Sequence, residues 1–226
     1  NGWYIVAAGN RTSDGAVART MSSALANRFC HIEVGANSAS WLDWALNNDI
    51  DPRVIGFIRY MPQRIFSMEG NKERGWPSPR SWERVSMEIE TADKHDLDKD
   101  LLHLLIEGLV GEGVAVEFMG FIEWTEKGPD VARMLAKEIK VKIPGRADQR
   151  FAMVSAIVHH IKQHDSPELL VDGFLDIATA LPNDWLQLII HDIRKIPDLR
   201  DFANLCIVHP RWDDEIGHRI IAEKVI

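Results

Sequence analysis

The spacing of apolar residues after position 35 is the feature that most limits what this chain can fold into. Apolar side chains recur at i, i+3, i+4 and i+7 through almost all of residues 39–225, which is the spacing of one buried face of an α-helix. In the segment that begins near Asp184, that face carries Trp185, Leu188, Ile189 and Ile193. The pattern predicts a mainly α protein, and 46% apolar and 27% charged residues are typical of a globular chain.

Breaks in this pattern divide it into a series of predicted helices. Prolines lie at or near most breaks, because a proline is tolerated in the first helical turn and disfavoured in a helix interior. Within residues 52–65 the pattern is interrupted at Pro62. The predicted helices cover residues 21–27, 39–48, 52–65, 79–92, 101–110, 114–126, 130–139, 148–163, 167–181, 184–196, 198–208 and 213–225.

The first part of the chain departs from helical spacing. Residues 4–8 form a short apolar run that ends at Gly9 and Asn10, and such a run beside turn residues predicts a buried strand. Residues 29–34 are the one other strong strand candidate. Because a buried strand needs partners on both sides, we expect residues 1–36 to be the remnant of an α/β core, in the C-terminal portion of a longer protein.

Composition predicts a further boundary. The polar stretch 93–99 separates two helical parts, which we expect to be a helical unit over residues 37–96 and a helical C-terminal domain over residues 97–226. Residues 1–96 contain 11 basic and 12 acidic residues, residues 97–226 contain 15 and 22, and the whole chain has a net charge of −8. This acidic balance argues against broad binding to nucleic acids or to anionic membranes.

Cysteine content and hydropathy favour the cytoplasm as the location. The two cysteines, Cys30 and Cys206, are too few for a disulfide framework, and we expect both to be reduced and buried. No signal peptide is visible, and no apolar stretch reaches the ~18 residues that a membrane span requires.

Two polar residues adjoin the predicted strands. Asn10 follows the run 4–8, at the strand end where ligands bind in open α/β sheets, so its amide is a candidate to orient water beside a phosphate; the alternative is an ordinary turn residue. Arg28 lies between a short predicted helix and the second strand. It is a candidate arginine finger, which stabilises transition-state charge in phosphoryl transfer, or a cation placed favourably at a helix C-terminus.

A third candidate, Arg80, is expected in the first turn of the helix over residues 79–92. Ser78 suits the N-cap and Pro79 the first helical position. A cation in the first turn opposes the helix dipole, at a cost of about 0.3–1 kcal/mol, and Arg84 adds a second charge one turn later. Because local rules are broken mainly at functional sites, Arg80 and the helix N–H groups predict an anion site. The alternative is a side chain that points into solvent.

In order along the chain, these pieces resemble the second half of a MoxR-like AAA+ ATPase. The end of the first apolar run, Ala7-Ala8-Gly9-Asn10, resembles the sensor 1 strand of that family. Residues 21–29 resemble its arginine-finger corner, and residues 77–82, which read Pro-Ser-Pro-Arg-Ser-Trp, resemble its sensor 2 segment at the start of a lid helix. The resemblance covers about residues 3–92 and assigns residues 37–96 to the lid.

The resemblance implies hydrolysis of ATP by a homo-oligomeric ring, hexameric or similar, coupled to remodelling of a protein client. ATP and Mg²⁺ would lie at the subunit interfaces. The resemblance further implies that Asn10 positions the attacking water, that Arg28 reaches the γ-phosphate bound by the neighbouring subunit, and that Arg80 contacts the nucleotide from the lid.

The phosphate-binding part of such an enzyme is missing from the chain. A P-loop needs Lys and Ser or Thr after its glycines, and the glycine-rich run 108–113 is followed by neither. No apolar strand ends in an acidic pair that would hold Mg²⁺. We therefore expect Walker A and Walker B segments to precede Tyr4, and we expect this chain alone to be inactive and to bind no cofactor.

Two other functions are compatible with the sequence. The missing phosphate loops and the long acidic helical part also fit a non-catalytic helical adaptor. The second alternative is a zinc-dependent hydrolase. His160 and His164 have the i, i+4 spacing that suits zinc on a helix, yet the Glu of a His-Glu-x-x-His hydrolase motif is missing. A solvated polar face near a helix end is the alternative for these histidines.

Overall fold

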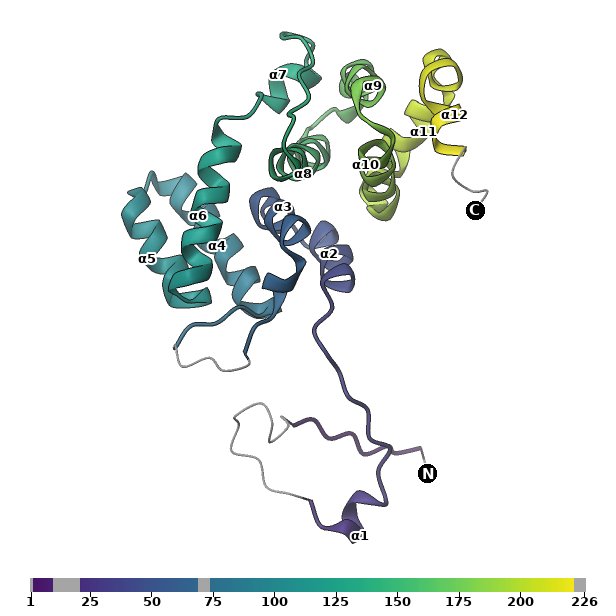
Figure 1. Ribbon diagram of the computed structural model, residues 1–226. Helices are drawn as coiled ribbons and strands as arrows, with labels where there is room; N and C mark the ends of the chain where they lie inside the picture. Colours follow the sequence, from purple (N-terminus) through teal and green to yellow (C-terminus); the bar gives the residue numbers. More distant parts are fainter. Residues whose placement is uncertain (1, 10–20, 69–73, 222–226) are drawn as a thin grey trace.

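The computed structural model describes residues 2–9, 21–68 and 74–221, and these form a mainly helical protein. Helices make up 70% of the structure, and the described residues contain no strand, which confirms the mainly α class. Figure 1 shows a helical body from α2 onward, with the described residues 2–9 and 21–36 lying away from it. Among the described helices, none is both long and apolar enough to cross a membrane.

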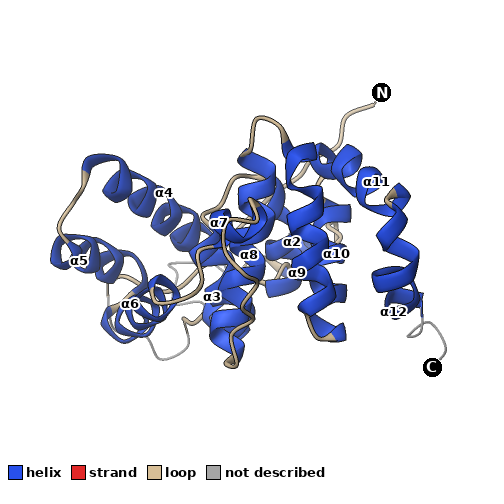
Figure 2. Ribbon diagram, turned by 90° about the horizontal axis from the view of Figure 1, so that it is seen from above, coloured by secondary structure: helices blue, strands red, loops and turns tan. Residues whose placement is uncertain are grey.

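The helical body follows the predicted order closely. Seen from above, the helical body has α4, α5 and α6 at one end, α11 and α12 at the other, and the remaining long helices between them (Figure 2). Its α-helices are α2 (Ser38–Asn47), α3 (Pro52–Tyr60), α4 (Pro79–His95), α5 (Lys99–Val110), α6 (Glu112–Glu126), α7 (Val131–Leu135), α8 (Ala147–Gln163), α9 (Val171–Ala180), α10 (Asn183–Lys195), α11 (Arg200–Val208) and α12 (His218–Ile221). Short 3-10 turns cover Pro62–Ile65, Pro167–Leu170 and Pro197–Leu199, and a π-helical turn covers Trp212–Gly217.

One predicted helix, over residues 130–139, is much shorter than its apolar pattern. α7 ends at Leu135 because Lys137 adopts a left-handed backbone conformation with φ of 60°. The amide of Glu138 then donates to the carbonyl oxygen of Arg133 at 2.9 Å, which is the closing hydrogen bond of a Schellman-type helix end. Glycine usually occupies that position, so the lysine gave no stop signal.

The two predicted strands are absent from the described residues. Residues 4–8 and 29–34 have no strand pairing, and Tyr4, Ile5 and Val6 are at least 83% exposed. A strand is held by hydrogen bonds to a neighbouring backbone, and the described part of the chain offers these segments no such neighbour. The short helix α1 (Ser23–Ala26) lies between them, inside the predicted helix over residues 21–27.

One continuous hydrophobic core runs through the helical body, from Trp41 in α2 to Ile216 near the C-terminus. Its centre includes an aromatic cluster of Phe57, Trp82 and Phe118, whose ring centroids lie 5.1–5.4 Å apart. These three side chains come from α3, α4 and α6 and have 0% exposure. The cluster therefore ties the start of α4 to helices on both sides of the predicted boundary at residues 93–99.

That boundary is a tight turn between two packed helices. α4 ends where Asp96 takes a left-handed conformation, with φ of 51°, and the amide of Leu97 donates to the carbonyl oxygen of Ala92 at 3.0 Å. Asp98 then caps α5 by accepting from the amide of Asp100. The polar stretch thus supplies the caps of two helices, and the division into units over residues 37–96 and 97–226 stays a prediction.

The two cysteines differ in exposure. Cys206 is 2% exposed, as expected, and its burial raises the pKa of its thiol to about 12. The expectation that Cys30 is buried is wrong, because Cys30 is exposed. It belongs to the predicted strand over residues 29–34, which no described residue covers.

Gly173 allows α9 to approach α7 closely. A Cβ atom at this position would lie 1.9 Å from the carbonyl oxygen of Leu135, so the two backbones would have to separate. Gly173→Ala is therefore expected to lower the free energy of unfolding by about 1–3 kcal/mol, measured by urea denaturation. The control is Gly120→Ala in α6, where a Cβ meets nothing within 4 Å. An equal loss in both variants would contradict this explanation.

Candidate functional site

The segment of residues 76–82 builds the start of α4 as the sequence predicts. The Ser78 side chain caps the helix by accepting from the amide of Ser81 at 3.1 Å, and Pro79 is the first helical residue. The Ser81 hydroxyl donates in turn to the carbonyl oxygen of Trp76 at 2.9 Å. These bonds fix the direction in which the chain enters α4, and with it the position of Arg80.

The second turn of α4 is anchored to the core. Trp82 is fully buried, and its indole Nε1–H donates to the carbonyl oxygen of Arg64 at 2.7 Å. The amide of Ser67 donates to the carbonyl oxygen of Pro77 at 3.2 Å, and the rings of Phe66 and Trp76 meet edge to face at 5.5 Å. Contacts between residues 64–67 and residues 76–82 therefore hold the N-terminus of α4 in place.

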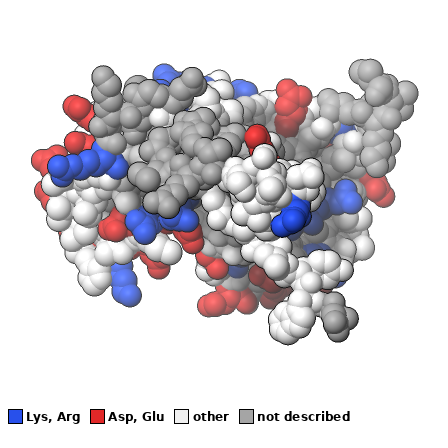
Figure 3. All heavy atoms as spheres, turned by 90° about the horizontal axis from the view of Figure 1, so that it is seen from below, with Lys and Arg blue, Asp and Glu red and all other residues white. Residues whose placement is uncertain are grey.

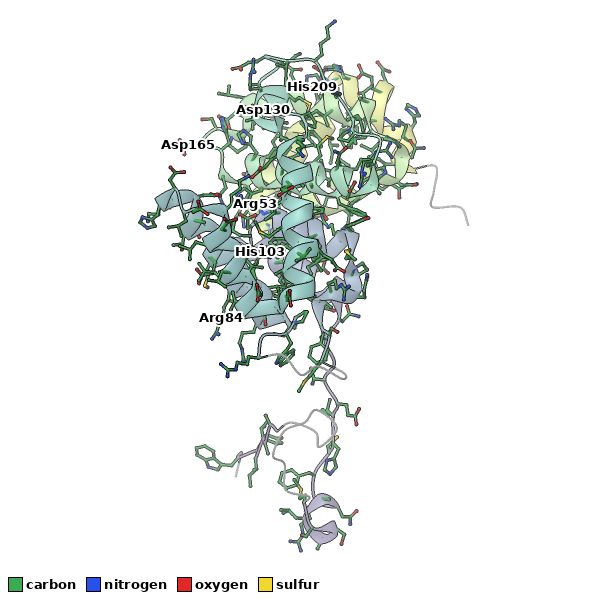
Figure 4. All side chains as sticks on the ribbon, turned by 60° about the vertical axis from the view of Figure 1, so that its left-hand side comes forward. Arg53, Arg84, His103, Asp130, Asp165 and His209 are labelled. Atoms are coloured by element: carbon green, nitrogen blue, oxygen red, sulfur yellow. The ribbon has the colours of Figure 1, made fainter. Side chains whose placement is uncertain are left out.

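Arg80 is exposed, and its guanidinium group has no partner among the described residues. No described residue forms an ion pair or a side-chain hydrogen bond with it, and no described acceptor meets its backbone N–H. Arg84 is exposed as well, and Figure 4 places it at the end of the helical body nearest the N-terminal segment. A guanidinium group, a free N–H and the positive end of a 17-residue helix therefore lie together at the surface. That combination suits an anion such as a phosphate.

Arg28 is also exposed, directly after α1. Its backbone amide donates to the carbonyl oxygen of Leu25 at 3.0 Å, and no described residue pairs with its guanidinium group. Asn10, the third candidate, lies outside the described residues. Figure 1 shows α1 well apart from α4, so the structure does not bring Arg28 and Arg80 together within one chain.

Charges of both signs are mixed on one face of the molecule. The face seen from below carries Lys and Arg side chains beside Asp and Glu (Figure 3). Its described part therefore offers no continuous basic surface of the kind that binds a nucleic acid backbone. Isolated arginines suit a compact anion better than a polymer.

A polar cleft, which the sequence did not indicate, lies at the opposite end of α4. It has a volume of about 650 Å³ and lies between α3, α4 and α8. Arg53 forms ion pairs there with Asp51 and Asp93. Burial alone would lower the pKa of Arg53, but its hydrogen bonds to the two carboxylates outweigh that effect and raise it. The cleft is lined by Asp49, Asp51, Pro52, Arg53, Ser86, Glu90, Asp93, His159 and Gln163.

The cleft is a poor metal site. Arg53 already forms ion pairs with two of its carboxylates, Asp51 and Asp93. Within the described residues there is no group of three or more His, Cys, Asp or Glu side chains that could hold a metal ion. The cleft has no sequence signature because its residues come from positions more than 100 apart.

The histidine pair at the end of α8 has structural contacts. The rings of His160 and His164 lie 5.8 Å apart, and His164 Nδ1 accepts from the amide of Ser166 at 3.1 Å. Burial and the nearby His164 lower the pKa of His160. His164 lies just beyond the end of α8 and has an extended backbone.

Comparison with models of known protein families, with curated proteins and with solved structures gives no match for this chain.

Proposed function

We propose that this chain is the sensor, lid and C-terminal part of a MoxR-like AAA+ ATPase, which couples ATP hydrolysis in a homo-oligomeric ring to remodelling of a protein client. The observation that carries the proposal is the state of Arg80. It occupies the first turn of α4, exposed and without a partner among the described residues, on a helix start that is otherwise fully capped and anchored. An unpaired cation at the positive end of a helix is unfavourable unless an anion binds there.

The exposed apolar residues near the N-terminus give independent support. Trp3 and Tyr4 are 94% and 92% exposed, and Ile32 and Val34 are 80% and 89% exposed. Large apolar side chains this exposed are normally covered in folded proteins when they lie in contiguous patches. We propose that the two segments that carry them are strands of an α/β core whose remaining strands, with the Walker A and Walker B segments, come from polypeptide that precedes Tyr4.

In this proposal, three residues of the chain act on bound ATP. Asn10 orients the attacking water through its amide, Arg28 stabilises the negative charge that develops on the γ-phosphate of the neighbouring subunit, and Arg80 holds the nucleotide against the lid. Mg²⁺ would neutralise phosphate charge during the reaction. In this proposal its ligands belong to the Walker segments.

Arg80→Ala in the protein extended to its full reading frame tests the proposal. We expect the variant to bind ATP at least about tenfold more weakly, because a charge-assisted hydrogen bond to phosphate contributes roughly 1.5–3 kcal/mol. Isothermal titration calorimetry with ATP measures the dissociation constant, and circular dichroism checks that the helices are retained.

Arg84→Ala is the matched control, because Arg84 is an exposed arginine one turn further along the same helix. We expect it to bind ATP nearly as the wild type does. Equal losses in both variants would reduce the effect to general electrostatics and contradict a specific contact at Arg80. Failure of the full-length protein itself to bind ATP would contradict the proposed ATPase and favour the helical adaptor.

A further inference from the structure

We propose that residues 97–226 are attached rigidly to the lid, so that lid and C-terminal helices move as one body when the nucleotide changes. This inference rests on the proposed function, which assigns residues 37–96 to the lid. It deepens that function by naming the C-terminal helices as the part that moves with the lid. Its basis is the contact that α2 and α3 make with α8 and α10.

The backbones of α3 and α8 approach each other closely. α3 makes its most extensive helix contact with α8, and a Cβ atom on Gly56 would lie 3.1 Å from Cα of Ala152. Val54, Phe57 and Ile58 of α3 have 0% exposure, so α3 lies within the shared hydrophobic core. Closely packed helices are bistable at most and do not slide continuously, so α3 cannot turn without carrying α8 along.

A buried ion pair locks a third helix to this contact. The guanidinium group of Arg59 in α3 lies 2.6 Å from the carboxylate of Asp192 in α10, with side-chain exposures of 6% and 2%. Arg59 also donates to the hydroxyl of Ser155 in α8 at 3.3 Å. One lid side chain therefore bridges two helices of the C-terminal part, in surroundings where a lost partner leaves a charge without water.

Two further ion pairs join the same parts at the surface. Lys162 in α8 reaches Asp49, after α2, at 2.7 Å and also donates to the carbonyl oxygen of Leu46 at 3.2 Å. Lys195 in α10 lies 2.6 Å from Asp43 in α2. By comparison, Figure 1 shows the helical body joined to α1 through an extended stretch of chain before α2. Within the described residues, the lid thus has more connections to the C-terminal helices than to the segment that precedes it.

The test measures distances between spin labels by pulsed electron paramagnetic resonance in the full-length protein. One label pair reports on the rigid attachment: Lys94→Cys on α4 and Asp214→Cys near the C-terminus, both exposed positions, with Cys30→Ser and other accessible cysteines replaced. We expect one narrow distance that is the same without nucleotide, with ADP and with a non-hydrolysable ATP analogue. A broad distribution, or a distance that changes with nucleotide, overturns the inference.

A second label pair reports on the motion of the body. It combines the native exposed Cys30 with Asp214→Cys. With bound nucleotide, we expect this distance to shift between ADP and the ATP analogue while the first pair stays constant; no shift overturns the proposed movement. The nucleotide-free measurement on the first pair decides the rigid attachment by itself. The failure of the proposed ATPase is read separately, as absence of ATP binding in calorimetry.

Discussion

Arg28→Ala in the full-length protein is expected to lower ATP turnover by about 10³–10⁵-fold and to leave the dissociation constant for ATP nearly unchanged. The reason is that an arginine finger acts on charge that develops only in the transition state, so its loss appears in kcat rather than in binding. The structure leaves the Arg28 side chain exposed and without an ionic partner among the described residues, which is the condition that a finger requires before assembly. A coupled ATPase assay measures the turnover.

The matched control for this variant is Arg200→Ala. Arg200 is an exposed arginine in the first turn of α11, far along the chain from the proposed site, and its loss should leave turnover unchanged. Analytical ultracentrifugation must show that Arg28→Ala still forms rings. Wild-type turnover in intact rings of the variant would eliminate Arg28 as the finger.

Asp192→Ala is expected to lower the free energy of unfolding of this chain by about 3–5 kcal/mol, because it leaves the Arg59 guanidinium group buried without its partner. Burial raises the pKa of Asp192, because it disfavours the charged carboxylate, and the charge of Arg59 acts against that rise. The two charges therefore depend on each other for stabilisation in the interior. Urea unfolding followed by tryptophan fluorescence measures the loss.

The double variant Arg59→Met/Asp192→Leu separates charge from packing. Because apolar side chains of similar volume often replace a buried ion pair without loss, we expect it to recover most of the stability that Asp192→Ala loses. Asp43→Ala, which breaks the exposed pair with Lys195, should cost at most about 1 kcal/mol. A small effect of Asp192→Ala, comparable to that of Asp43→Ala, would show that the buried pair does not hold α3 to α10.

The helices of the body were predictable because each buries one face on a shared core. α4 illustrates this: Trp82, Val85 and Ile89 lie at i, i+3 and i+7, and all three have 0% exposure. The predicted strands were not found because a strand depends on neighbours that local sequence does not supply. The apolar character of residues 4–8 and 29–34 predicts burial, and the described residues provide nothing to bury them.

The candidate site was predictable only where its signals are local. Ser78, Pro79 and Arg80 act within one helical turn, so their positions followed from capping rules. The polar cleft around Arg53 and the bridge from Arg59 to Asp192 were missed, because they join residues that only the packing of distant helices brings together. Charged residues in an amphipathic pattern are normally assigned to the surface, and Arg59 follows that pattern while lying in the interior.

The core shared by α3 and α8 bears on how such a protein is inherited. Were a gene to lose the codons after position 96, α3 would lose its contact with α8, and Phe57 would lose the packing of Phe118. Apolar surface uncovered in this way favours aggregation. The C-terminal helices in isolation would expose the opposite side of the same contact. Exchange of this region between genes as an independent cassette is therefore disfavoured, and the two halves of the helical body are expected to descend as one unit.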